Sequence, residues 1–337
     1  MLLSEFDFPF DASLVADHPA EPRDQARLLV LPRGGGPCMH HRVADLPELL
    51  KANDLIIVND TKVLPARLTG HKQPGGGHLE LVLVKPVTTD QWEVLCKGSI
   101  KPGQVIELDG GATATVTEQE SGRVVMQFSS SVPALLEKVG RMPLPPYIKR
   151  EPTDQDRRWY QTLFAQREGA IAAPTAGLHF TDRLLAALKE KGVRTATVTL
   201  HVGPATFRPV TAERIEDHRM GTEWAELPSH TAAAINETKK AGGRIVAVGT
   251  TVVRTLESAV SVDGTVRPTK GEIGLFITPG YTFKVVDVLM TNFHLPRTTL
   301  LMLVSAFAGL EPLRAAYQEA VREKYRFYSY GDAMLIL

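Results

Sequence analysis

Four apolar segments of the chain each end in a group of small or polar residues. Residues 54–58 and 244–248 are almost continuously apolar, residues 196–200 alternate, and residues 288–290 form a short apolar run, which predicts buried or half-buried strands. The groups that follow them are Asn59-Asp60-Thr61, His201-Val202-Gly203, Gly249-Thr250-Thr251 and Thr291-Asn292-Phe293-His294. After a single strand, small and polar residues are explained by a turn. In open α/β sheets, however, ligands bind beyond the carboxyl ends of strands, so four such ends favour a shared pocket.

A further loop, residues 172–181, is almost free of bulky side chains and precedes a helix predicted over 182–191. Leucines recur on one face of this helix, and Gly192 ends it. Backbone N–H groups at such a helix start suit a carboxylate or a phosphate. The alternative is a Pro/Gly turn around one buried histidine, His179.

The pattern of apolar and polar residues changes after Leu68. From residue 70 to about residue 128, short alternating segments are separated by Gly- and Pro-rich turns, which is typical of a small β-barrel or sandwich. Further helices are predicted over 132–139, 229–241, 300–308 and 311–324, and strands over 28–31 and 332–337. We therefore expect a mixed α/β domain, residues 1–68 and 144–337, interrupted by an inserted all-β, barrel-like domain of residues 69–143.

Composition narrows the class of protein. The 337 residues are 43% hydrophobic, enough to bury a full core, and the formal net charge is zero, so a nucleic-acid partner would have to bind a local patch. No run of eighteen apolar residues predicts a membrane span, and residues 1–10 lack the layout of a signal peptide. Two isolated cysteines indicate reduced thiols, so we expect a cytoplasmic protein with no membrane contact.

Familiar cofactor signatures are missing. The chain contains no G-x-x-x-x-G-K-[ST] loop, no G-x-G-x-x-G after a strand and no G-x-S-x-G elbow. The ten histidines show no spacing typical of metal ligands, so no metal is expected.

Several residues remain as candidates for chemistry. The candidates are the histidines His179, His201, His218 and His294, the carboxylates Asp60 and Glu257, and the aromatic residues Phe180, Phe207 and Phe293. Each has an ordinary alternative. Asp60 could form an Asx-turn, Glu257 could pair with Arg254 on a helix surface, and the phenylalanines could be core residues.

Two stretches combine basic and aromatic residues, as proteins do that contact phosphates and stack on unpaired bases. The first runs from 141 to 158 and contains Tyr147, Lys149 and Arg150; the second contains Arg322 and Arg326 among aromatic residues. The alternative for both is a solvated protein surface.

Taken together, several blocks resemble one family. The blocks are residues 59–68, 143–148, 172–181, 249–258, 291–296 and 329–334, which include Asn59-Asp60-Thr61-Lys62, Pro143-Leu144-Pro145-Pro146-Tyr147 and Thr291-Asn292-Phe293-His294. They resemble the S-adenosylmethionine:tRNA ribosyltransferase-isomerases of queuosine biosynthesis, and the resemblance runs along the whole chain. It implies transfer and rearrangement of the ribosyl part of S-adenosylmethionine onto the aminomethyl-deazaguanine wobble base of tRNA, giving epoxyqueuosine, adenine and methionine. It also implies a large α/β domain with an inserted β-barrel.

The chain departs from the family pattern at two places. Pro204-Ala205 stands where Ala-Gly is more usual, which stiffens the loop. Gly221 stands where a second histidine is common, which leaves His218 and Glu223 as the remaining polar residues of that motif.

With this reaction in view, each candidate receives an expected role. Asp60, His179 and His218 are expected to carry the proton transfers, with acid and base left open. The expected substrate-binding residues are Asn59, Thr61, Arg67, Thr175, Gly177, Thr181, His201, Thr250, Thr251, Arg254, Glu257, Asn292 and His294. Arg254 and the helix after Thr181 would hold the methionine carboxylate. Tyr147, Lys149, Arg150, Arg322 and Arg326 are expected to contact the tRNA anticodon loop.

No cofactor is expected beyond S-adenosylmethionine as a co-substrate, and the protein is expected to be a monomer. Two other classes stay open at this point. A hydrolase of nucleoside N-glycosidic bonds could use the same carboxylates and aromatic residues, and would release adenine without tRNA. A non-catalytic RNA-binding protein could use the inserted barrel, but would leave the polar strand ends without a purpose.

Overall fold

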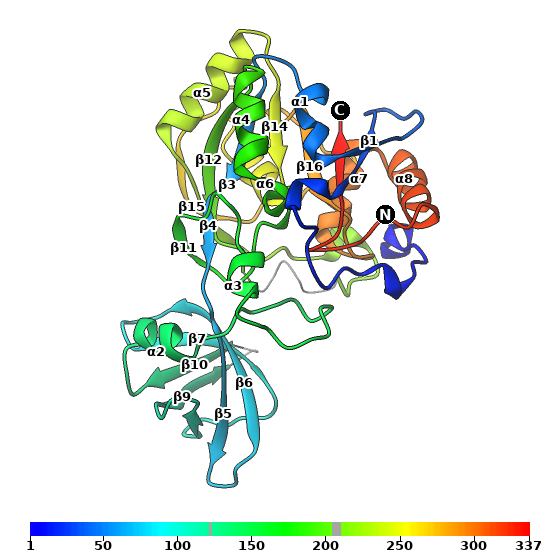
Figure 1. Ribbon diagram of the computed structural model, residues 1–337. Helices are drawn as coiled ribbons and strands as arrows, with labels where there is room; N and C mark the ends of the chain where they lie inside the picture. Colours follow the sequence, from blue (N-terminus) through cyan, green and yellow to red (C-terminus); the bar gives the residue numbers. More distant parts are fainter. Residues whose placement is uncertain (121–122, 204–209) are drawn as a thin grey trace.

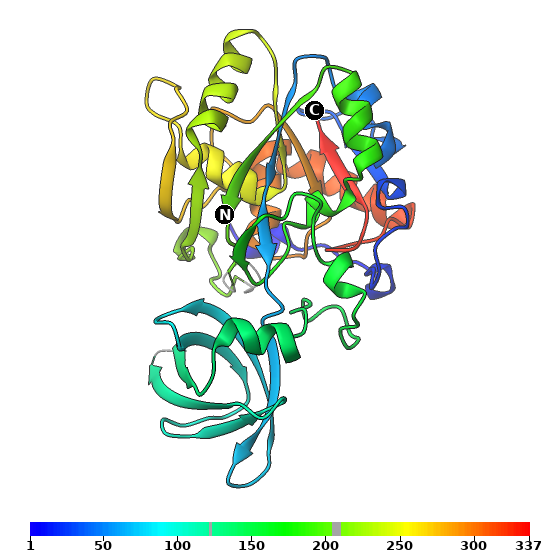
Figure 2. The same cartoon turned by 60° about the vertical axis from the view of Figure 1, so that its left-hand side comes forward.

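The computed structural model describes residues 1–120, 123–203 and 210–337. In Figure 1 a large domain of helices and strands lies above a smaller barrel of strands, and Figure 2 shows the same two bodies from another side. The chain enters the barrel after β4 (Thr61–Val63) and leaves it after α2 (Val132–Val139). The expected α/β fold with an inserted all-β barrel is confirmed.

The large domain is built on a nine-stranded sheet with the strand order β15-β13-β12-β3-β14-β16-β17-β1-β2. Its strands are β1 (Arg27–Leu31), β2 (Met39–Arg42), β3 (Leu55–Asn59), β12 (Arg194–Leu200), β13 (Glu223–Leu227), β14 (Ile245–Val248), β15 (Thr269–Ile273), β16 (Val288–Asn292) and β17 (Ala333–Ile336). β3 pairs in parallel with β12 and β14, and β14 pairs in parallel with β16. The four predicted strands therefore point the same way, and their carboxyl ends share one edge of the sheet, as expected.

Helices cover both faces of this sheet. The helices α1 (Leu46–Leu49) and α4 (Asp182–Glu190) cover one face, and α5 (Ser229–Lys240), α6 (Thr250–Ser258), α7 (Thr299–Ala308) and α8 (Leu310–Arg322) cover the other. Along β3, Leu55 and Ile57 belong to the core under α5–α8, whereas Ile56 and Val58 belong to the core under α1 and α4. Because both faces are buried, the central strands are continuously apolar.

The helices α7 and α8 meet at a sharp bend. Gly309 between them has a φ of 90°, and a Cβ there would lie 3.2 Å from Pro312 Cδ. In the described ranges, no single helix is long and apolar enough to cross a membrane, and α7 with α8 reaches that length only as a pair bent by 112°.

The inserted domain is a closed barrel with the strand order β10-β7-β6-β5-β8-β9. Its strands are β5 (Arg67–Gln73), β6 (His78–Pro86), β7 (Gln91–Lys97), β8 (Val105–Leu108), β9 (Thr113–Glu120) and β10 (Arg123–Phe128). Alternate residues of each strand point into one apolar core, which α2 covers through Val132, Leu135 and Leu136. Gly70 allows β5 and β8 to approach closely, because a Cβ there would lie 2.4 Å from the carbonyl oxygen of Glu107.

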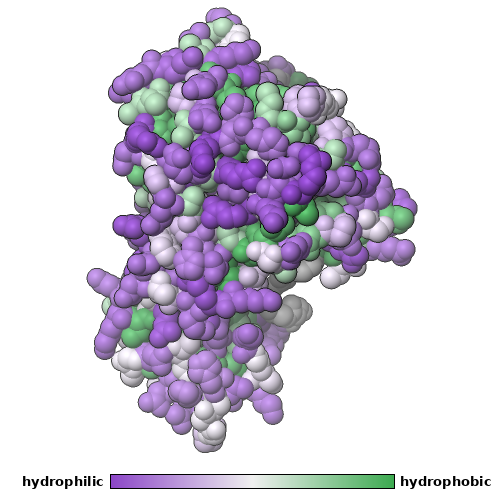
Figure 3. All heavy atoms as spheres, turned by 45° about the vertical axis from the view of Figure 1, so that its right-hand side comes forward, coloured by the Kyte–Doolittle hydropathy of each residue, from purple (hydrophilic) through white to green (hydrophobic). Residues whose placement is uncertain are grey.

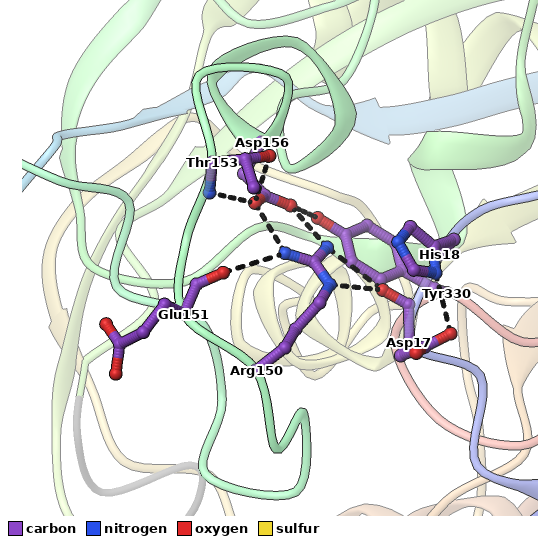
Figure 4. Close-up of polar contacts among 7 residues, drawn as sticks. All are labelled: Asp17, His18, Arg150, Glu151, Thr153, Asp156 and Tyr330. Atoms are coloured by element: carbon purple, nitrogen blue, oxygen red, sulfur yellow. Dashed lines mark hydrogen bonds and ion pairs between the residues drawn. The ribbon is translucent and has the colours of Figure 1, made fainter.

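The chain returns to the large domain through a connector that includes α3 (Asp156–Trp159) and ends in β11 (Arg167–Ala170), which pairs with β4. Figure 4 shows how buried Asp156 anchors this connector. Its carboxylate accepts two hydrogen bonds of 2.7 Å from Arg150 and others from Thr153 and Tyr330, while Arg150 also donates to the carbonyl of Asp17. The cluster therefore joins the connector to both ends of the chain.

Candidate functional site

A pocket of about 720 Å³ opens where β14 and β16 end. Its described lining comes from residues 173–176, 249–251, 291–295 and 328–329, together with Tyr147, Val202, Thr298 and Leu300. Among these residues there is no Asp, Glu, Lys or Arg, and hydroxyl, amide and aromatic groups predominate.

Asn292, at the end of β16, is 1% exposed and joins three parts of the pocket. Its side-chain oxygen accepts a hydrogen bond from Thr175 Oγ1 at 3.1 Å. Its nitrogen donates to the carbonyl of Tyr328 at 3.2 Å and lies 3.2 Å from His179 Nε2, which accepts the second proton. Asn292 therefore orients the hydroxyl of Thr175, which also lines the pocket.

His179 is 4% exposed and does not belong to the described pocket lining. Burial first, and then the positive charges of Arg326 and Arg23, lower the pKa of His179 to about 3, so its imidazole is neutral. The structure thus gives His179 a position behind the pocket wall, where it orients Asn292.

Aromatic rings form one wall of the pocket. The rings of Tyr147 and Tyr328 lie 4.8 Å apart, and Phe293 lines the pocket beside them. The hydroxyl of Tyr147 lies 2.5 Å from Ser329 Oγ. Tyr328 has a φ of 70°, and its buried hydroxyl has no partner among the described residues. Such a wall suits a planar base or a cation, and the buried hydroxyl of Tyr328 is a donor that no described residue uses.

The helix α6 begins at the pocket. Its first residues, Thr250 and Thr251, line the pocket, and Gly249 before them adopts a φ of 93° without supplying a side-chain cap. The first N–H groups of α6 are therefore not capped by the preceding side chain, and they carry the positive end of the helix dipole.

The N-terminus of α4, by contrast, is already occupied. Thr181 accepts a hydrogen bond from the backbone of Leu184 and donates to Asp24 at 2.6 Å. Arg183 also pairs with Asp24 at 2.9 Å. This helix start therefore already has a side-chain cap and a neighbouring carboxylate from the chain itself, and the expected anion site there stays a prediction.

Asn59 and Asp60 follow β3. Asn59 bridges to β12, because its side chain exchanges hydrogen bonds with both backbone groups of Leu200 and also accepts one from Thr61. Asp60 is 7% exposed and accepts a 2.6 Å hydrogen bond from Thr199 on one carboxylate oxygen. No described residue donates to its other oxygen, so Asp60 keeps a free acceptor.

A second cavity, a cleft of about 2560 Å³, lies between the barrel and the large domain. Trp92 and Leu136 line it from the barrel, and His201 and Trp224 line it from the large domain. Val202 lines both the cleft and the pocket, so the two cavities adjoin.

Arg254 lies on α6 and is 3% exposed. It forms a buried ion pair with Glu223 and donates to the carbonyl of Leu275, and it is absent from the described lining of both cavities. Glu223 in turn accepts from the backbone of Gly203 at 2.9 Å, next to the cleft. One part of its guanidinium is thus paired, whereas its buried Nη2 has no hydrogen-bond partner among the described residues, so the assignment of Arg254 to a ligand carboxylate stays a prediction.

Glu257 also has a structural position. Its carboxylate accepts hydrogen bonds from the backbones of Lys284, Val285 and Val286 and from the hydroxyl of Tyr281. The alternative of a surface ion pair with Arg254 is therefore wrong, since Arg254 pairs with Glu223. Glu257 is absent from the described lining of both cavities, and its role in substrate binding stays a prediction.

His294 lines the pocket, and its Nε2 lies 2.7 Å from Thr291 Oγ1. Burial lowers the pKa of His294 to about 4. Other predicted residues are absent from the described lining of both cavities. They are Asn59, Asp60, Thr61, Thr181, Arg67, which pairs with Glu80, Gly177, which packs on Thr162, and His218.

The residues predicted to contact tRNA differ in their burial and in their ion pairs. Arg150 belongs to the buried cluster of Figure 4, and Arg326 pairs with buried Asp332. Arg322 pairs with Glu319 on the surface, whereas Lys149 is exposed with no ion pair among the described residues. Figure 3 shows hydrophilic residues over much of the visible face of the large domain.

Sequence reasoning missed Trp224 and Gly169, and it listed Tyr328 only as part of a patch. The contact of Gly169 with His201 and the stacking of Trp224 on His201 cannot be read from a single sequence. Trp224 does lie in a segment of alternating apolar and polar residues. Phe207 and Pro204-Ala205 lie outside the described residues. In the ranges that the structure describes, no three His, Cys, Asp or Glu side chains form a group that could hold a metal ion.

The chain is similar to known proteins over its whole length. The model of a family described as queuosine biosynthesis protein matches residues 3–336. The chain is 50% identical to the S-adenosylmethionine:tRNA ribosyltransferase-isomerase of Trichlorobacter lovleyi, with 100% of both chains covered. It is 51% identical to the protein of the same name from Parvibaculum lavamentivorans, covering 100% of this chain and 99% of that one.

A solved structure is similar as well. The crystal structure of S-adenosylmethionine tRNA ribosyltransferase from Thermotoga maritima has a TM-score of 0.57 and 36% identity to this chain. The match covers 99% of this chain and 100% of that one, so it includes both the large domain and the barrel.

Proposed function

The chain belongs to the queuosine biosynthesis protein family, and we propose on that premise how its two adjoining cavities divide the reaction. The activity is that of an S-adenosylmethionine:tRNA ribosyltransferase-isomerase. The ribosyl part of S-adenosylmethionine is transferred to the aminomethyl-deazaguanine wobble base of tRNA and rearranged to an epoxy-cyclopentane. Adenine and methionine leave.

S-adenosylmethionine binds in the pocket at the ends of β14 and β16. The aromatic wall of Tyr147, Tyr328 and Phe293 offers a surface on which adenine stacks. The N-terminus of α6, at Thr250 and Thr251, has no side-chain cap and lines the pocket, so it suits the methionine carboxylate, whereas Arg254 is absent from the described lining. Hydroxyl and amide groups of Thr175 and Asn292 remain for the ribose.

The tRNA base enters through the cleft between the two domains. A wobble base lies in the anticodon loop, where it can be splayed out of the stack. Lys62, Lys85 and Arg157 line this cleft. Lys62 pairs with Glu168 and Lys85 with Glu93 on the surface, and such exposed pairs are weak enough for a phosphate to replace the carboxylate. The observation that carries the proposal is that Val202 lines both cavities, because the amine and the ribosyl group must meet where they join. In this proposal the protein acts as a monomer in the cytoplasm.

Asp60 belongs to the described lining of neither cavity, but it precedes Thr61, which contacts His201 at the edge of the cleft, and one of its oxygens has no donor among the described residues; we assign it a proton transfer. The sulfonium makes the neighbouring ribose 5′ hydrogens acidic, so a base there forms an ylide, and the departing adenine takes up a proton. His179 orients Asn292 in this scheme instead of exchanging protons, because it is neutral and lies behind the wall. His218 is absent from the described lining of both cavities and receives no role.

The test uses S-adenosylmethionine labelled in the ribose together with tRNA that carries the deazaguanine precursor. We expect ribosyl label on the tRNA with one adenine released per transfer. Adenine released without tRNA would favour a glycosidase instead, and tRNA binding without turnover would favour a binding protein. Binding of tRNA should weaken steeply with salt, and salt-independent binding would argue against the cleft cations.

A further inference from the structure

His201 stands where the two cavities meet. It follows β12, lines the cleft and precedes Val202, the residue shared with the pocket. A side chain at this position can reach a group of the tRNA base that approaches S-adenosylmethionine.

Three contacts hold the imidazole ring in one orientation. Its Nδ1 lies 2.8 Å from Thr61 Oγ1, and its face stacks on Trp224 with ring centres 5.0 Å apart and an angle of 15°. Gly169 lies against Cδ2, Cε1 and Nε2, where an added Cβ would be within 2.9 Å of the ring. Since Nδ1 is engaged by Thr61, Nε2 is the nitrogen left for a ligand.

Charged groups surround this ring on each packed element. Asp60 before β4 attracts a proton to His201, and Arg167 on β11 opposes it. Lys270 of β15 lies over the ring of Trp224, and Glu223 beside Trp224 is paired with Arg254. Burial, which is the largest effect, lowers the pKa of His201, so the ring is neutral near pH 7. In the tautomer whose Nδ1–H donates to Thr61 Oγ1, Nε2 carries the free electron pair.

We propose that His201 is the general base that removes a proton from the aminomethyl ammonium of the tRNA base; the proposal rests on the function proposed above. The electron pair of Nε2 forms the new N–H bond, and the amine keeps the pair with which it forms the bond to the ribosyl carbon. The imidazolium then gives the proton to water in the cleft. His201 is thus a catalytic residue and not only a binding residue.

The test measures label transfer to tRNA by His201→Gln across pH. At pH 7 we expect a loss of about 10²- to 10⁴-fold, the usual contribution of a general base. The loss should shrink tenfold or more by pH 9, because the amine then loses its proton to solvent. His201→Ala should recover activity when imidazole is added. The exposed His230→Gln on α5 serves as the control and should retain wild-type rates.

A glycine pair tests the ring position separately. Gly169→Ala places a methyl group against the imidazole, whereas Gly271→Ala, with a φ of 139°, meets no atom within 4 Å. Both variants strain a similar backbone conformation, since Gly169 has a φ of 147°. Only Gly169→Ala should lower label transfer, by tenfold or more, with S-adenosylmethionine affinity unchanged.

The outcomes separate the two proposals. Equal losses for His201→Gln at pH 7 and pH 9 without imidazole rescue would reduce His201 to a structural residue, and wild-type rates in the variant would also overturn the inference. If the wild-type protein transfers no ribosyl label, the proposed function fails, and the inference fails with it.

Discussion

The side-chain nitrogen of Asn292 lies 3.2 Å from His179 Nε2, and this contact connects the pocket to a histidine that stands behind its wall. The imidazole accepts the hydrogen bond only while it is neutral. Protonation of His179 would therefore cost both the contact and the desolvation of a buried charge.

The free energy of unfolding should fall as the pH falls below about 6.5. The pKa of His179 is about 3 in the folded protein and 6.5 as its model value, so the unfolded chain binds more protons between these values. Stability from this group is complete above pH 6.5 and is lost as the pH falls towards 3. At pH 5 the loss should be about 2 kcal/mol, measured by urea unfolding. In His179→Gln this part of the pH dependence should disappear, and its persistence would assign it to other groups.

Tyr328→Phe should weaken S-adenosylmethionine binding without lowering stability. The hydroxyl of Tyr328 is buried and has no partner among the described residues, so its removal costs the folded protein nothing, but takes a donor from the ligand. We expect about a tenfold higher Kd in calorimetry, or about 1.4 kcal/mol. The control is Tyr325→Phe, whose hydroxyl bonds to His40 at 2.8 Å. It should lose stability and keep affinity; the reverse pattern would contradict the assignment.

Arg254→Met should destabilise the protein by about 3–5 kcal/mol, because it leaves the buried carboxylate of Glu223 without its guanidinium. Urea unfolding measures the change. The matched control is Arg123→Met in the barrel, where a 48% exposed arginine pairs with Glu93 and Glu118. That change should cost about 1 kcal/mol or less. Similar losses in both variants would show that the buried pair contributes no more than a surface pair.

Asp60→Asn should lower turnover by about 10²-fold or more while the fold remains intact. The amide oxygen can still accept the hydrogen bond from Thr199, so the melting temperature should change little. Asp90→Asn, an exposed carboxylate of the barrel, is the control and should retain full activity. Turnover near the wild-type level in Asp60→Asn would remove Asp60 from the mechanism.

The sequence predicts the parts of this fold that depend on local pattern. Continuous apolar runs marked the strands β14 and β16, and the residues after them, Thr250, Thr251 and Asn292, do line one pocket. The prediction succeeds because parallel strands bring their carboxyl ends to a common edge whatever the loops between them do. The helix over 132–139 and the inserted barrel follow from periodicity in the same way.

The partners of charged side chains could not be predicted. Arg254 pairs with Glu223, 31 positions away, and Asp24 meets Thr181 from 157 positions away. Such pairings depend on the packing of whole elements. A charged side chain with no partner nearby in the sequence can therefore have an ion-pair or hydrogen-bond partner in the fold. Arg150, predicted to contact tRNA, is also satisfied, because Asp156 accepts hydrogen bonds from both of its terminal nitrogens and the carbonyl of the distant Asp17 accepts another.

The position of β17 has a consequence for the order in which the protein can be made. This strand lies between β16 and β1, and its register joins Ala333 to Leu28, about 300 residues earlier in the chain. During synthesis β1 emerges from the ribosome early, but has no neighbour on that side until residues 333–336 follow. At about 5–20 residues per second, β1 and its apolar side chains wait at least about 15 seconds for their partner strand. The large domain therefore cannot complete its sheet until the last residues are made, whereas the barrel, whose strands are contiguous in the sequence, can fold before it.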